Sequence, residues 1–109
     1  MIETVLRGLL ASPEWREQSP RDINNGACED FQQHALEVLG SDCGAEEVCD
    51  GSFPEIGEMC SRFARPAGGM FALPGHFWIL HNGRHYDAEA PAGVERWQDL
   101  PIYARALPT

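Results

Sequence analysis

The strongest local constraint in this chain is the dipeptide Asn82-Gly83, which lies between two short segments rich in β-forming residues. Asn-Gly is favoured in two-residue hairpin turns because both residues tolerate the positive φ angles that such a turn requires. Residues 77–80 precede the dipeptide and residues 84–88 follow it, both with the composition of β-strands. The sequence therefore predicts an antiparallel β-hairpin over residues 77–88.

A two-residue turn also fixes the register of the two strands. The pairs expected are 81 with 84, 80 with 85, 78 with 87 and 76 with 89. By alternation, one face of the hairpin carries His76, Trp78, Leu80, His85, Asp87 and Glu89.

His76 then lies opposite Glu89 and diagonal to Asp87. Diagonal neighbours are roughly 7 Å apart at Cα, which a carboxylate and an imidazole can bridge. Such a carboxylate fixes the imidazole tautomer and stabilises its charged form. The hairpin therefore supplies a candidate general base with an orienting acid.

Two helices are expected before the hairpin. Apolar residues recur at helical spacing over residues 2–10, and Ser12-Pro13 ends that segment. A second helix is expected after the loop Asn24-Asn25-Gly26, and Gly40 ends it. Cys28 would thus lie in the first turn of a helix, just after a glycine-bearing loop.

The rest of the chain gives weaker signals. Residues 41–75 are rich in Gly, Pro and acidic residues, with one weak helical pattern over 53–63. Residues 92–93 are predicted to form a turn and residues 100–103 an edge strand, where proline is tolerated. We expect a single α+β domain spanning residues 1–109, with N-terminal helices packed on a small antiparallel sheet.

Cys28 is the candidate nucleophile. A thiol at a helix N-terminus feels the positive end of the helix dipole, which favours the thiolate. The acidic neighbours Glu29 and Asp30 act the other way, so a protonated histidine would be an important partner. The Cys28 N–H, with the side chain of Asn24 or Asn25, is the candidate oxyanion site.

The segments Asn25–Phe31, His76-Phe77-Trp78 and Tyr86-Asp87 resemble the papain-like cysteine hydrolases, including the NlpC/P60 and transglutaminase-like families. The order Cys, His-x-Trp, Asp is most similar to the transglutaminase core. The resemblance covers residues 24–103.

This resemblance implies a papain-like or transglutaminase-like fold in which Cys28 attacks an amide or isopeptide carbonyl and forms a thioester. His76 would be the base and Asp87 its orienting residue. Glu89 is the alternative candidate for the orienting residue. Trp78 lies on the same face of the hairpin as His76, so it would either form a wall of the site or belong to the core, as aromatic residues in strands usually do. The expected enzyme is a cysteine peptidase or amidase, or an acyltransferase.

Two sets of residues contain side chains that commonly bind metals. His76, His85, Asp87 and Glu89 share a face but lack any recognised ligand spacing. Cys43, Cys49 and Cys60 lack the C-x-x-C spacing of zinc sites. We therefore expect no metal and no cofactor.

The formal charge of −9, from 8 basic and 17 acidic residues, disfavours direct binding to nucleic acid or to anionic lipid. No apolar run approaches ~18 residues and the first ten residues do not resemble a signal peptide. We expect a cytoplasmic protein with free thiols and a protein or peptide substrate.

The acidic charge also allows a different class of function. The chain would then be a non-catalytic inhibitor that mimics nucleic acid, as anti-CRISPR proteins do, and would bind a basic surface of a partner protein. Partner binding that falls steeply with salt and survives Cys28→Ala would favour this alternative.

Overall fold

The computed structural model describes residues 1–40, 43–49, 52–53 and 76–104. The elements in chain order are α1 (Ile2–Leu10), α2 (Pro20–Asp22), the π-helical turn η1 (Ile23–Ala27), α3 (Cys28–Leu39), β1 (Glu46–Cys49), β2 (Phe77–His81), β3 (Arg84–Asp87), β4 (Ala90–Val94), the 3-10 turn η4 (Trp97–Asp99) and α5 (Pro101–Ala104). They form an α+β domain.

The four strands form one antiparallel sheet in the order β1-β2-β3-β4. His81 pairs with Arg84 and Leu80 with His85, which confirms the predicted hairpin and its register. Asn82 and Gly83 have φ angles of 49° and 77°, as the two-residue turn requires. The recorded ladder between β2 and β3 stops at Ile79–Tyr86, so the expected pairs 78–87 and 76–89 lie beyond it.

Two strands were not predicted. β1 falls in the segment whose Gly, Pro and acidic residues hid any alternation. β4 contains Pro91 and Gly93, which led us to expect a turn there, but β4 is an edge strand, where a proline removes no inner hydrogen bond. Gly93 is required there because a Cβ would lie 2.6 Å from Cε1 of Tyr86.

The expected edge strand over residues 100–103 is wrong. Leu100 lies between η4 and α5, and residues 101–103 belong to α5, in which Pro101 occupies the first helical position. Proline suits that position because its missing N–H has no helical partner there. The weak helical pattern of residues 53–63 lies outside the described residues, apart from Phe53.

The helix α1 confirms the first helical prediction, and Gly40 ends α3 with a φ of 84°. The expected loop at Asn24-Asn25-Gly26 is wrong, because these residues form the π-helical turn η1 that joins α2 directly to α3. Helical residues therefore run without interruption from Pro20 to Leu39. Such wide turns are frequent at functional sites.

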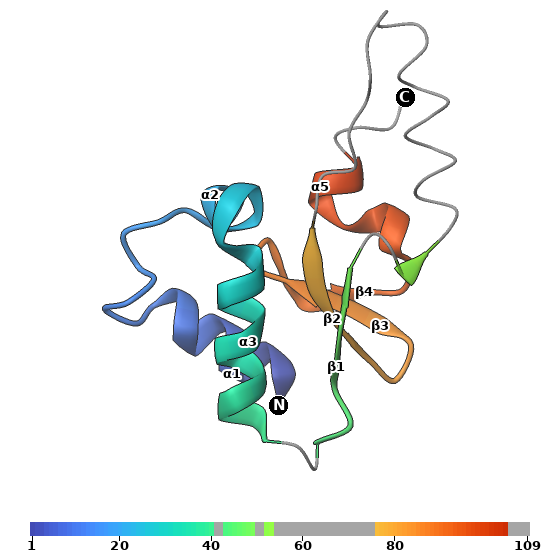
Figure 1. Ribbon diagram of the computed structural model, residues 1–109, viewed down its shortest axis with the longest axis horizontal. Coiled ribbons are helices and arrows are strands. Elements are labelled where there is room, and N and C mark those ends of the chain that lie inside the picture. The colour runs from blue at the N-terminus through green and yellow to red at the C-terminus, as the bar shows by residue number, and fades with distance from the viewer. Residues whose placement is uncertain (41–42, 50–51, 54–75, 105–109) are drawn as a thin grey trace, which may run out of the picture.

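The sheet carries a hydrophobic core on each face, because neighbouring residues of β2 point in opposite directions. Ile79 packs with residues of the N-terminal helices, among them Leu6, Phe31 and Ala35. Trp78 packs with Trp97, Leu100 and Tyr103 near the end of the described chain. Accordingly, α1 and α3 lie on one side of the sheet and α5 lies at the other (Figure 1). None of the helices in the described ranges has the length and apolar character needed to cross a membrane.

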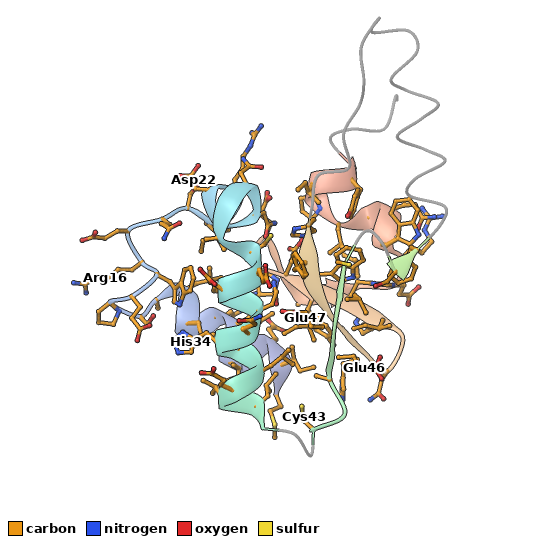
Figure 2. The ribbon with its side chains drawn as sticks, in the orientation of Figure 1. Arg16, Asp22, His34, Cys43, Glu46 and Glu47 are labelled. Carbon is orange, nitrogen blue, oxygen red and sulfur yellow. The ribbon has the colours of Figure 1, made fainter. Side chains whose placement is uncertain are left out.

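Two adjacent carboxylates of β1 differ in their surroundings. Figure 2 shows Glu47 directed toward α3 and Glu46 directed away from it. The Oε2 atom of Glu47 is buried without a hydrogen-bond partner among the described residues. Burial and the nearby Glu29 carboxylate raise the pKa of Glu47. The charged form of Glu47 therefore destabilises the fold.

We predict that Glu47→Gln raises the melting temperature at neutral pH. When the pKa of a carboxyl group is raised in the folded state, the protein loses stability as the pH rises and the group ionises. The gain in melting temperature from Glu47→Gln should therefore shrink as the pH falls and Glu47 becomes protonated. Thermal unfolding of both proteins across the acidic range measures this. Glu46→Gln, an exposed neighbour, is the control and should show no comparable gain; an equal gain in both variants would contradict the assignment.

Candidate active site

The fold brings together the three residues that the sequence singled out as a triad. Cys28 begins α3, His76 immediately precedes β2 and Asp87 ends β3. His76 and Asp87 are each 0% exposed and Cys28 is 7% exposed. The His76 Nε2 atom lies 2.9 Å from Oδ2 of Asp87. The predicted diagonal relation across the hairpin is therefore present as a direct hydrogen bond.

The Asp87 carboxylate is held in a fixed orientation by the turn that follows β3. Its Oδ1 accepts hydrogen bonds from the backbone N–H groups of Glu89, at 2.9 Å, and Ala90, at 2.8 Å. Such aspartate-to-backbone bonds are typical of tight turns. The remaining oxygen, Oδ2, is thereby directed at His76, so the turn into β4 orients the acid.

His76 also forms a side-chain hydrogen bond with Cys28. Burial by itself lowers the pKa of His76, but the hydrogen bonds and charges of Asp87 and Cys28 raise it to about 9. His76 is therefore protonated at neutral pH.

Cys28 shows the complementary change. Burial by itself raises the pKa of its thiol, but the hydrogen bond from His76, the backbone N–H groups of Phe77 and Glu29 and the charge of His76 together lower it. An unpaired buried thiolate would be strongly disfavoured. The two shifts together favour the thiolate–imidazolium form of the Cys28–His76 pair.

The helix dipole contributes less to this pair than the sequence indicated. Cys28 follows the helical residues of α2 and η1, so it does not sit at a free helix N-terminus. The dipole effect is confined to the first turn of a helix. The lowered pKa of Cys28 is due mainly to His76 and to the N–H of Phe77, a donor that no sequence motif predicted.

Aromatic residues hold the plane of the His76 ring. Trp78 stacks on it, with ring centroids 5.5 Å apart, and Tyr103 meets it edge-on at 6.0 Å. Trp78 is fully buried, so it supports the imidazole from within the core and does not line an opening as a wall. Tyr103 was missed because its segment was expected to be an edge strand.

The supporting residues divide into two kinds. Asn24 is 3% exposed, and its Nδ2 donates to Oε1 of Glu89 at 3.0 Å. This contact ties the turn before Cys28 to the turn after Asp87. Asn25 is exposed, and the structure does not bring it to the thiol, because the π-helical turn directs Asn24 inward instead.

The side chains considered as metal ligands do not converge. His85 accepts a hydrogen bond at Nδ1 from Trp78 Nε1 at 2.9 Å, and Glu89 is bound to Asn24. Within the described ranges, no group of three or more His, Cys, Asp or Glu side chains is placed to hold a metal ion. Cys43 and Cys49 are free thiols outside the triad, although Cys49 pairs across the sheet with Phe77, the residue after His76. Cys60 lies outside the described residues.

The linings of three cavities bounded by described residues include none of the three triad residues. The largest, about 560 Å³, is next to the hairpin turn and is lined by Cys43, His81 and Tyr86 among others. The other two lie against the C-terminal half of α3 and between α1 and β4. The chemistry of the Cys28 site therefore rests on its contacts, not on the size of a described cavity.

A comparison of the chain with models of known protein families, with curated proteins and with solved structures found no match. We therefore infer the function of this chain from the geometry of its site.

The pKa values of the two buried histidines should be shifted in opposite directions. We predict that His76 stays protonated until the pH approaches about 9, whereas burial lowers the pKa of His85. Asp87→Asn should lower the pKa of His76 because it removes the carboxylate charge, and should leave His85 unaffected. Imidazole nitrogen shifts in an NMR pH titration measure both residues in one sample. A His76 pKa near its ordinary value in the wild type would contradict the ion pair.

Proposed function

We propose that this chain is a thiol hydrolase or acyltransferase that acts on an amide or isopeptide bond through Cys28, His76 and Asp87. The observation that carries the proposal is that His76, fully buried, is hydrogen-bonded to Asp87 on one side and to Cys28 on the other. This is the connectivity of a nucleophile, a base and an orienting acid.

The cost of burying Cys28, His76 and Asp87 together supports a functional role for these residues. A buried ion pair is often less stabilising than apolar residues of similar volume, because both charges lose their hydration. Three ionisable groups together in the interior are therefore a poor solution for stability alone. Perturbed pKa values of this kind cluster at functional sites.

The placement of the three residues also supports a papain-like or transglutaminase-like core. The cysteine begins a helix packed on an antiparallel sheet, the histidine precedes a strand of that sheet and the aspartate ends the next strand. This arrangement is the one that the resemblance in sequence implied. The site itself, more than the fold class, carries the functional argument.

In the proposed reaction, the Cys28 thiolate attacks the carbonyl carbon of the substrate. As the carbon–nitrogen bond breaks, the His76 imidazolium donates its proton to the departing amine, and a thioester to Cys28 remains. Asp87 keeps His76 oriented and stabilises its positive charge. Water or a second amine then attacks the thioester, with His76 accepting the proton from the attacking group.

Asn24 and Glu89 support the site through the hydrogen bond between their side chains. Their hydrogen bond positions the turn before the nucleophile against the turn after Asp87. A protein or peptide is the substrate class that carries the amide or isopeptide bond required by this chemistry.

The proposal is tested by incubating the protein with a pool of peptide amides and detecting both cleaved products and acyl adducts by mass spectrometry after an acid quench. We expect adducts on Cys28 only. His76→Ala should slow turnover by about 10²–10⁴-fold, and Cys28→Ser should abolish the thioester.

Cys49→Ser is the matched control, because Cys49 is a free thiol outside the triad. It should leave turnover unchanged. Turnover that survives Cys28→Ser, or an adduct on Cys49 in place of Cys28, would refute the proposal.

A further inference from the structure

Three buried polar residues form a row along the helical segment that carries the nucleophile. Asn24, Cys28 and Gln32 are spaced four residues apart and are 3%, 7% and 0% exposed. Residues four apart lie on the same side of a helix, one turn from each other. Two carboxamides therefore flank the thiol, one turn before it and one turn after it.

These carboxamides have buried polar atoms that nothing in the described chain satisfies. Oδ1 of Asn24, and both Nε2 and Oε1 of Gln32, have no hydrogen-bond partner among the described residues. Leaving such atoms unpaired in the interior is unfavourable, and native proteins rarely do so without a reason. A methionine or leucine would fill the Gln32 position without this penalty. The unpaired carboxamide therefore indicates that a ligand forms the missing hydrogen bonds.

The orientation of both side chains is constrained. Helical side chains point toward the N-terminus of their helix, so Gln32 extends back toward the turn of Cys28. Asn24 is held through Nδ2 by Glu89, which leaves its Oδ1 as an acceptor. By contrast, the neighbouring Gln33 is exposed, and its Nε2 lies 3.4 Å from Glu29 Oε1.

We propose that Asn24 and Gln32 form a subsite that recognises an amide group of the substrate beside Cys28. This inference rests on the proposed function for the identity of the nucleophile. The N–H of the bound amide donates to Oε1 of Gln32 and its carbonyl accepts from Nε2 of Gln32, while Oδ1 of Asn24 offers a further acceptor beside them. The subsite favours peptides and carboxamides over esters, which have no N–H to donate.

The test uses two small alkylating reagents that differ in this one respect. Iodoacetamide has an N–H donor and methyl iodoacetate does not, and both transfer a small group to a thiolate with loss of iodide. Their rates at Cys28 and at Cys49 are read by mass spectrometry in the same molecules. The rate ratio at Cys49 corrects for the intrinsic reactivity of each reagent.

In the wild type we expect a corrected preference for iodoacetamide at Cys28 of about threefold to tenfold, the range of one or two hydrogen bonds. Gln32→Met should remove most of this preference, whereas the matched control Gln33→Met should retain it. Gln32→Leu repeats the test with a differently shaped apolar side chain. Because both replacements delete unpaired polar atoms, neither should lower the melting temperature.

A preference that is absent in the wild type, or that persists in both Gln32 variants, would overturn the subsite. The rate itself reports separately on the proposed function. If Cys28 reacts no faster than Cys49 with either reagent, the proposed thiolate–imidazolium pair is refuted. The corrected rate ratio still tests whether Asn24 and Gln32 recognise the amide.

Discussion

The hydrogen bond between His76 and Asp87 is the interaction on which the rest of the site depends. Both side chains are fully buried, and Asp87 satisfies its other oxygen with two backbone N–H groups. Removing one partner of such a pair commonly costs about 3–5 kcal/mol, because the other charge stays buried alone. That is a large share of the stability of a small domain. By keeping His76 charged, this pair helps to lower the pKa of the Cys28 thiol.

Local signals in the sequence predicted the part of the site that lies within the hairpin. Asn82-Gly83 specified the turn, the turn specified the register, and the register placed His76 diagonal to Asp87. The first helix followed in the same way from its apolar spacing. In each case, residues close in the chain determined the structure.

The errors arose where contacts distant in sequence override local preference. Asn24-Asn25-Gly26 has the composition of a loop, yet it forms a helical turn whose Asn24 bonds Glu89 across the site. Pro91 and Gly93 argue against a strand unless β4 is known to be an edge. Tyr103 and the Phe77 N–H reach the catalytic pair only through tertiary packing, which no spacing pattern expresses.

The buried carboxamides of Asn24 and Gln32, like the His76–Asp87 pair, lower the stability of the fold and lie beside the thiol. Unpaired carboxamides and a buried charged pair are both unfavourable in isolation, and they occur together around one cysteine. Natural proteins often hold such groups where activity requires them. The hydrophobic cores on the two faces of the sheet supply the compensating stability.

The most direct measurement of the central claim is the ultraviolet absorbance of the Cys28 thiolate as a function of pH, taken as the difference between the wild type and Cys28→Ser. We predict that in the wild type this absorbance persists well below the pH at which an ordinary thiol ionises. In Asp87→Asn it should disappear at a higher pH than in the wild type. A thiolate that appears only in the ordinary thiol range, with the same midpoint in both backgrounds, would contradict the ion pair.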